Sequence, residues 1–228
     1  QADEDLRKDS MLDSGSMAVF YRILSSVQQS WLGLYADRGL AEANGINVDE
    51  LETLDDFHNL LAIYRDNGMD IPYAMTNNGW DGPLMSAFGI SGSGWLSPFI
   101  TVDGKIEYSF ITDEYYDYLS TMHQWYDEGL FESEFHGRTT AAAWDNQLLA
   151  TGTVGMLSTL ATSADMINVL SGLDYRAIKS PVRKAGDIRN VAQVGSCTSR
   201  VEGPFTSVTT SCQDVESVIR YLDFFYSD

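Results

Sequence analysis

Apolar residues recur at helical spacing directly after Thr53, which predicts an amphipathic helix. Thr53 can cap that helix together with Asp56 at its third position, and Gly68 is suited to end it. The apolar positions that share one side are Leu54, Phe57, Leu60, Leu61 and Tyr64. Because residues three and four apart lie on one side of a helix, this side is expected to pack against a core.

Two further capped helices are predicted by the same pattern. One starts at Thr112 and stops at Gly129, and the last helix follows Ser211. The expected inner face of the first is formed by Tyr115, Leu119, Met122 and Tyr126. In the last helix, the apolar residues at helical spacing are Val215, Val218, Ile219, Leu222 and Phe225. A helix is also predicted over 140–149, and another follows a strand and runs to about Leu170.

Strands are predicted where short apolar runs are bounded by turn-forming residues. The stretch 17–35 is rich in aromatic and β-branched residues and predicts one or two strands, after a polar, acidic tail over 1–16. Runs at 71–75 and 154–157 predict short buried strands.

A hairpin is predicted around Asp103-Gly104, because both residues tolerate positive φ. This pair joins the predicted strands 99–102 and 105–108. Strands that alternate with helices predict an α/β layer fold, and the sequence has no internal repeat of fixed period.

The composition is that of a globular, acidic protein. Of 228 residues, 44% are hydrophobic and 12% aromatic, enough to bury a full core. The formal net charge of −19 repels phosphate backbones and anionic membrane surfaces, so nucleic acid is not an expected partner. Basic residues gather between Arg176 and Arg189, where a solvated loop is favoured over a cationic patch. Cys197 and Cys212 lack metal-ligand spacing and can form at most one disulfide.

The sequence carries no pattern of a membrane span or an export signal. The apolar runs around Phe20, Leu60 and Leu157 fall far short of the roughly 20 residues of a spanning helix. The start QADEDLRKD lacks the cationic and apolar regions of a signal peptide. Either the protein is cytosolic or its export signal lies outside this sequence.

The order of motifs resembles the extracellular solute-binding proteins of family 1, especially the Gram-positive lipoproteins that serve carbohydrate importers. The matching segments are YADRGLAEANGIN with ETLDDFHNLLAIYRDNGMDIPYAM, then DGKIEYSFITDEYYDYLSTMHQWYDEGLFESEF, GTVGML and TSVTTSCQDVESVIRYLDFFYSD. Together they cover about 33–228 in the order found in the family.

The resemblance implies one lobe of the periplasmic-binding-protein-like II kind, with a mixed sheet flanked by helices. It implies that 17–228 is a fragment of a longer two-lobed protein, which captures a solute, expected to be a sugar or oligosaccharide, in the cleft between lobes. The partners would be the membrane subunits of an ABC importer. The full protein would be extracellular and lipid-anchored at the cell surface, with its signal and anchor outside this chain.

No metal or cofactor is expected. Many relatives have a calcium-binding insertion before the I-P strand, but here only the short stretch 66–70 remains. That stretch cannot supply the roughly six to eight oxygen ligands that Ca²⁺ takes.

A sugar site needs an aromatic platform for the apolar face of the ring. Trp80 and Trp95 lie in loops of Gly, Asn and Ser where no periodicity requires them in a core, so both are candidate platforms. Trp31 and Trp144 are further candidates, whereas Trp125 lies in a helix and is expected to be core.

Sugar hydroxyls also need polar partners that donate and accept hydrogen bonds. Asn78 and Asp81 flank Trp80, although turn formation alone would explain both. Gln29 precedes another tryptophan, and Ser158 follows the GTVGML strand. These four polar residues complete the predicted ligand-binding set.

The sequence is not expected to encode an enzyme. It has no G-x-S-x-G, H-E-x-x-H or P-loop motif, and the histidines His58, His123 and His136 are expected at the surface. With 33 acidic residues, carboxylate pairs occur by chance. The alternatives are a surface adhesion or protein-interaction module and, behind it, a carbohydrate-active enzyme. Binding to a host protein without a small ligand would favour the first, and turnover of an oligosaccharide the second.

Overall fold

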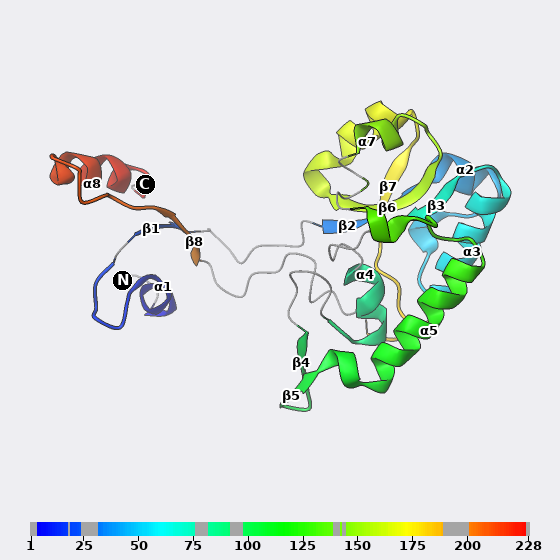
Figure 1. The fold of residues 1–228 in the computed structure, drawn as a ribbon, viewed down its shortest axis with the longest axis horizontal. Coiled ribbons are helices and arrows are strands. Elements are labelled where there is room, and N and C mark those ends of the chain that lie inside the picture. Colours follow the sequence, from blue (N-terminus) through cyan, green and yellow to red (C-terminus); the bar gives the residue numbers. More distant parts are fainter. Residues whose placement is uncertain are drawn as a thin grey trace. The chain divides into compact units, whose positions relative to one another are not determined.

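The computed structural model describes residues 4–17, 19–23, 32–75, 82–91, 98–138, 142, 145–188 and 201–226 (Figure 1). The chain forms two compact units, the first made of Gln1–Gln29 with Ser196–Asp228 and the second of Ser30–Gly195. A single lobe over 17–228 was expected from the sequence. The first unit forms because segments near both ends of the chain pair with each other, and the lobe boundaries stay a prediction.

The first unit is built on an antiparallel pair of strands. β1 (Phe20–Ile23) pairs with β8 (Val201–Thr206) in a separate two-stranded sheet. Helix α1 (Glu4–Ser10) lies in the stretch expected to be a polar tail. Helix α8 (Val215–Phe224) was predicted correctly, and the Asp214 side chain caps it by accepting a hydrogen bond from the Ser217 amide at 3.1 Å. None of the residues of α8 is buried.

The second unit contains a mixed sheet with the strand order β3-β6-β2-β7. β2 is antiparallel to both β6 and β7, whereas β3 is parallel to β6. The bounds of the strands are β2 Leu32–Asp37, β3 Ile71–Ala74, β6 Val154–Leu160 and β7 Tyr175–Ile178. The predicted α/β fold with a mixed sheet is therefore confirmed.

Helices cover both faces of this sheet (Figure 1). One buried cluster joins the sheet to α3 (Leu54–Asp66), α4 (Gly82–Met85) and α5 (Asp113–Asp127). The other joins it to α6 (Asn146–Leu149) and α7 (Ala164–Ser171). Side chains of β2 alternate between the two clusters, as the period of a strand requires: Leu34 and Ala36 point to the first and Tyr35 to the second. A short helix α2 (Arg38–Ala43) follows β2 directly.

Helix α3 starts and packs as the sequence predicts. Thr53 and Asp56 form a reciprocal capping box, with the Thr53 amide donating to Asp56 at 2.8 Å. The chain leaves the helix through Gly68 at a φ of 94°. The Tyr64 ring lies against Gly155 of β6, where a Cβ atom would be only 2.4 Å from a ring carbon. This glycine lets the helix approach the sheet closely.

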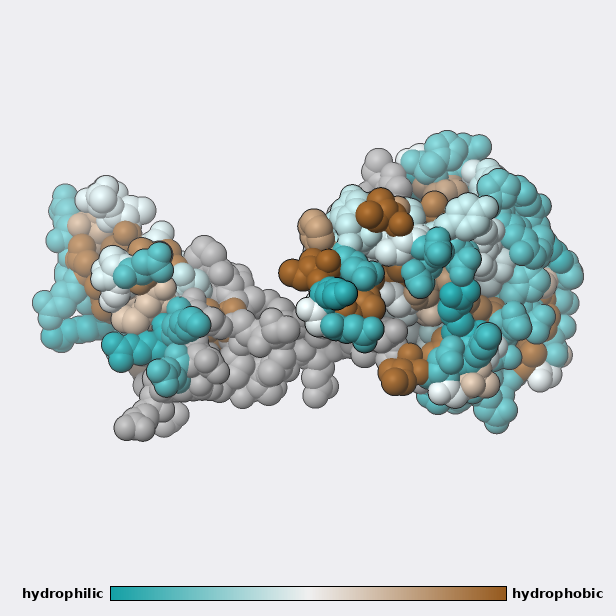
Figure 2. Space-filling model, turned by 90° about the horizontal axis from the view of Figure 1, so that it is seen from below, coloured by the Kyte–Doolittle hydropathy of each residue, from teal (hydrophilic) through white to brown (hydrophobic). Residues whose placement is uncertain are grey.

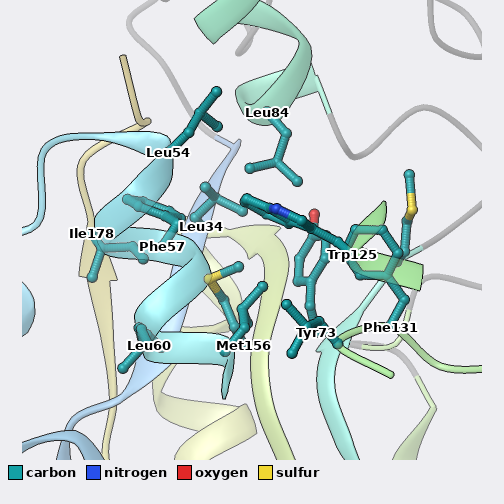
Figure 3. Close-up of a cluster of buried hydrophobic side chains, with 14 of the residues drawn as sticks. Leu34, Leu54, Phe57, Leu60, Tyr73, Leu84, Trp125, Phe131, Met156 and Ile178 are labelled. Atoms are coloured by element: carbon teal, nitrogen blue, oxygen red, sulfur yellow. The ribbon is translucent and has the colours of Figure 1, made fainter. Parts of the chain in front are cut away.

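Helix α5 turns a different side to the core than the sequence predicted. The structure buries Tyr118, Met122 and Trp125, whereas Leu119 and Tyr126 are exposed. Three buried positions at spacings of four and three define a face rotated from the expected one. The Trp125 indole lies among core side chains, as expected (Figure 3).

Three other predicted elements compare as follows. The hairpin of β4 (Phe99–Val102) and β5 (Lys105–Tyr108) is confirmed, with φ of 49° at Asp103 and 76° at Gly104. β6 is longer than predicted, because two polar residues continue it beyond Leu157. The helix expected over 140–149 is described as α6 only from Asn146, and part of that range lies outside the described residues.

Candidate functional site

The carboxyl ends of three strands meet at one edge of the sheet. β3, β6 and β7 run in the same direction, and β2 runs against them. Leu160 at the end of β6 therefore pairs with Leu32 at the start of β2, and Ile178 at the end of β7 pairs with Leu34. In open α/β sheets, ligands bind outside the carboxyl ends of strands, so this edge is the candidate site.

The end of β6 places two buried hydroxyl groups at this edge. The Ser158 Oγ atom lies 3.5 Å from the Tyr73 hydroxyl, beyond the usual hydrogen-bond length of about 2.8 Å. The Thr159 Oγ1 atom is buried and has no hydrogen-bond partner. A buried hydroxyl without a partner costs about 1–3 kcal/mol. The edge therefore carries hydrogen-bonding capacity that the fold does not use.

The opposite edge of the sheet is fully hydrogen-bonded. The Asp37 carboxylate accepts from the amides of Leu40 at 2.9 Å and Asp174 at 3.0 Å. The Tyr64 hydroxyl donates to the Asp37 carbonyl at 2.6 Å, and burial raises the pKa of that hydroxyl. Arg38 completes the network through an Nε to Oδ2 contact of 2.8 Å with Asp174. Within the described part of the chain, Thr159 alone has a buried side-chain polar atom without a partner.

The described basic residues near β7 contact carboxylates or lie exposed, and Arg189 lies outside the described residues. Arg176 contacts Asp174 at 3.2 Å, and Arg183 contacts Asp117 at 2.7 Å. Lys179 directly follows β7 and is exposed at the candidate edge. The interpretation as separate, solvated side chains agrees with these contacts.

Of the predicted ligand-binding residues, the structure describes Ser158 alone. It lies inside β6 rather than after it, because the strand continues to Leu160. The other predicted residues, Gln29, Trp31, Asn78, Trp80, Asp81, Trp95 and Trp144, lie outside the described residues. Tyr73 was missed by the sequence analysis. The sequence feature that could have found it is the tyrosine in the buried IPYA strand, since its hydroxyl group needs a polar partner.

The histidines do not form a catalytic arrangement in the described part of the chain. His58 is half-buried, packs against the Trp125 ring at 5.8 Å and contacts Glu128 at 2.5 Å, so it is less exposed than expected. Hydrogen bonds from Gln124 and His58 lower the pKa of Glu128. His123 and His136 are exposed. No group of three or more His, Cys, Asp or Glu side chains among the described residues is arranged to hold a metal ion.

Comparison with solved structures identifies the class of protein that has this fold. The chain is similar to an HMO-binding ABC-transporter-associated solute-binding protein from Bifidobacterium longum infantis, with a TM-score of 0.74, 16% identity, and coverage of 98% of this chain and 48% of that chain. It is also similar to the S. pneumoniae substrate-binding protein FusA in complex with fructo-nystose, with a TM-score of 0.66, 16% identity, and coverage of 97% and 45%. The fold is that of the solute-binding proteins of ABC transporters, which are binding proteins rather than enzymes.

One curated protein is similar in sequence. The sequence is 26% identical to lipoprotein LipO of Bacillus subtilis (strain 168) over 227 residues, which cover 87% of this chain and 43% of the relative. No family model matches the sequence. The chain thus spans about half the length of the proteins it matches. Among the described residues, no helix is long and apolar enough to cross a membrane.

Proposed function

We propose that residues 30–195 supply one wall of a carbohydrate-binding site in a longer extracellular solute-binding protein. The full protein captures a sugar or oligosaccharide in a cleft between two lobes and delivers it to the membrane subunits of an ABC importer. A lipid anchor is proposed from the lipoprotein relative. The observation that carries the proposal is the buried Thr159 hydroxyl, which has no hydrogen-bond partner at the carboxyl edge of the sheet. Ser158 precedes it in the strand and is also buried, on the opposite face of the sheet.

A sugar is the ligand whose chemistry suits these hydroxyls. Each sugar hydroxyl both donates and accepts, so it can pair with a threonine or serine hydroxyl in either sense. The Tyr73 hydroxyl lies 3.5 Å from the Ser158 hydroxyl and borders this edge. The neighbours solved with fructo-nystose, kestose and stachyose support this ligand class.

Chain connectivity supports the tryptophan candidates near the same edge. Gln29 and Trp31 directly precede β2, which starts at this edge. Asn78, Trp80 and Asp81 belong to the short connection between β3 and α4. We include the four that lie within 30–195 in the proposed site, together with Trp95 and Trp144 as further platforms. Gln29, just before this range, stays a candidate.

The proposed ligand is a neutral sugar. With a formal charge of −19, the chain repels uronic acids, and Lys179 is a single exposed cation at the edge. Tighter binding of uronic-acid oligomers than of neutral ones, with a steep dependence on salt, would contradict this part of the proposal.

Replacement of Trp80 tests the proposed site. The full two-lobed protein is first titrated by calorimetry with stachyose, kestose and lacto-N-biose, to find a neutral sugar that it binds. Trp80→Ala is then expected to weaken its binding by on the order of 1–3 kcal/mol, because a stacking platform is lost. The thermal midpoint should change little, since the proposed role of this ring is ligand contact.

The matched control is Trp125→Ala, which removes a buried ring from the core. It is expected to lower stability by about 3–5 kcal/mol while the folded fraction keeps its affinity. A Trp80→Ala variant that loses thermal stability but keeps wild-type affinity would assign Trp80 to packing and move the platform to Trp95. Tight binding to a host protein with no sugar ligand would favour an adhesion module instead.

A further inference from the structure

The hairpin of β4 and β5 gathers apolar side chains on one face. Cross-strand partners in an antiparallel pair share a face, and Phe99 pairs with Tyr108 while Thr101 pairs with Ile106. The Phe99 and Tyr108 rings lie 5.4 Å apart between centroids. Two aromatic rings, an isoleucine and a threonine thus form a continuous surface, which we call the hairpin face.

The hairpin face is open to solvent. Phe99 is 59% exposed, Tyr108 39% and Ile106 77%. Figure 2 views the molecule from the side on which the hairpin lies in Figure 1 and shows apolar surface there next to polar groups. Apolar side chains that adjoin one another at the surface, rather than lie singly, are typical of interaction sites.

A series of ring contacts anchors the hairpin face to the core. Tyr108 lies 5.3 Å from Phe110, and the series continues inward at 4.8, 6.1 and 5.6 Å through Tyr115, Tyr118 and Phe88. At its base, the Ser109 amide donates to the Pro98 carbonyl at 2.8 Å. The rings are therefore held in place before any ligand arrives, which lowers the entropy cost of binding.

The size of the hairpin face suits a short glycan better than a protein. Each strand has four residues, which gives a length of about 13 Å at a rise of roughly 3.3 Å per residue. A stable protein interface buries roughly 800 Å² on each partner, drawn from about 20–30 residues. The hairpin supplies only eight strand residues.

The charges around the hairpin select against an anionic ligand. Asp103 and Glu107 lie on the hairpin, Asp113 and Glu114 open the helix that follows, and Lys105 is the one cation of the two strands. These carboxylates repel a uronic or sulfated sugar and leave a neutral one unaffected.

We propose that Phe99 and Tyr108 form a second sugar-binding platform, on which a neutral oligosaccharide stacks the apolar faces of its rings. The choice of ligand class rests on the function proposed above, whereas the location rests on the hairpin alone. Thr101 and the Tyr108 hydroxyl border the rings and can bond the sugar hydroxyls. The platform extends the carbohydrate-binding surface beyond the edge of the sheet.

Methyl NMR on the present chain tests the platform. The probes are stachyose, kestose and lacto-N-biose, with an alginate tetramer as the anionic comparison. The Ile106 methyl signal is expected to shift saturably with at least one neutral probe and less with the anionic one. Phe99→Leu and Tyr108→Leu keep apolar bulk but remove a flat ring, so each is expected to weaken that binding about three- to tenfold.

The matched control is Tyr116→Leu, which removes an exposed tyrosine of α5 outside the hairpin and should leave the Ile106 titration unchanged. Unchanged core methyl signals show that each variant is folded. An Ile106 signal that no neutral probe shifts, or that titrates in both ring variants as it does in the wild type, overturns the platform. The Met75 methyl reports on the sheet edge in the same spectra: a Met75 shift alone retains the proposed function, and an Ile106 shift alone retains the platform.

Discussion

At the scale of single residues, the central strand β6 combines close packing with unused polar capacity. Gly155 allows the Tyr64 ring to lie directly on the strand, and Thr159, near the other end, keeps a buried hydroxyl without a partner. The same strand therefore serves the core at its start and the candidate site at its end.

Gly155→Ala is expected to destabilise the second unit. The new Cβ atom would lie 2.4 Å from a Tyr64 ring carbon and 2.9 Å from the Pro72 carbonyl oxygen, so ring and strand must move apart. Overpacking of this kind costs about 1–3 kcal/mol, which urea unfolding measures. Gly137→Ala is the control, because nothing lies within 4 Å of its added Cβ. Equal unfolding free energies for the two variants would show that the ring moves freely.

At the scale of elements, the part of the chain between β3's bridge partner and α6 connects the two core clusters. It starts at Phe131, which bridges to Tyr73 of β3 and packs in the first core cluster, and it ends in α6 in the second. Arg138 joins the two ends of this segment: its Nε donates to Glu132 at 2.7 Å and its Nη1 to Asp145 at 3.0 Å.

Arg138→Met is expected to lower the unfolding free energy by on the order of 3 kcal/mol, because two carboxylates lose their shared partner in a largely buried place. The Arg138 side chain is 12% exposed, and its hydrogen bond to Glu132 raises its pKa. Arg176→Met provides the comparison, since that side chain is 53% exposed and its ion pair contributes about 0–1 kcal/mol. Similar losses in both variants, measured by urea unfolding, would contradict the bridging role of Arg138.

The sequence predicted those elements whose signals are local. The Asp103-Gly104 turn and the Thr53 capping box are set by residues within four positions of each other, and both are present as predicted. The buried face of α5 was predicted only in part. Met122 and Trp125 lie in the core as expected, whereas Tyr118 fits the helical pattern as well as Leu119 does, and the sequence did not select it. Only contacts with distant parts of the chain decide between the two faces.

The location of the candidate site was even harder to predict from the sequence, because it depends on contacts between distant parts of the chain. Ser158 was expected in a loop, but its pairing with Leu34 of β2 extends the strand through it. Strand order brings the ends of β3, β6 and β7 to one edge, and no local pattern contains that order. The role of the loop tryptophans as sugar platforms stays a prediction, because these residues lie outside the described part of the chain.

At the scale of the whole molecule, the two units differ in how much core they contain. Every residue of both buried clusters lies between Leu34 and Ile178, inside the second unit. In the first unit, α8 buries none of its residues.

Residues 30–195 are therefore expected to fold as an isolated fragment. Its circular dichroism should show cooperative thermal unfolding with a midpoint close to that of the main transition of the full chain, because no core residue is removed. A fragment with helical signal but no cooperative transition would mean that residues outside 30–195 are needed to complete the second unit.

The antiparallel pairing of β1 with β8 determines how the chain responds to a pulling force. Phe20 at the start of β1 pairs with Thr206 at the end of β8, so tension applied through the two termini reaches both strands at the same end of the ribbon. The hydrogen bonds between the two strands then break one after another from that end, rather than all together as they would under shear. For tension applied at these two strand ends, we expect the ribbon to separate at lower force than the four-stranded sheet, because its hydrogen bonds break one at a time.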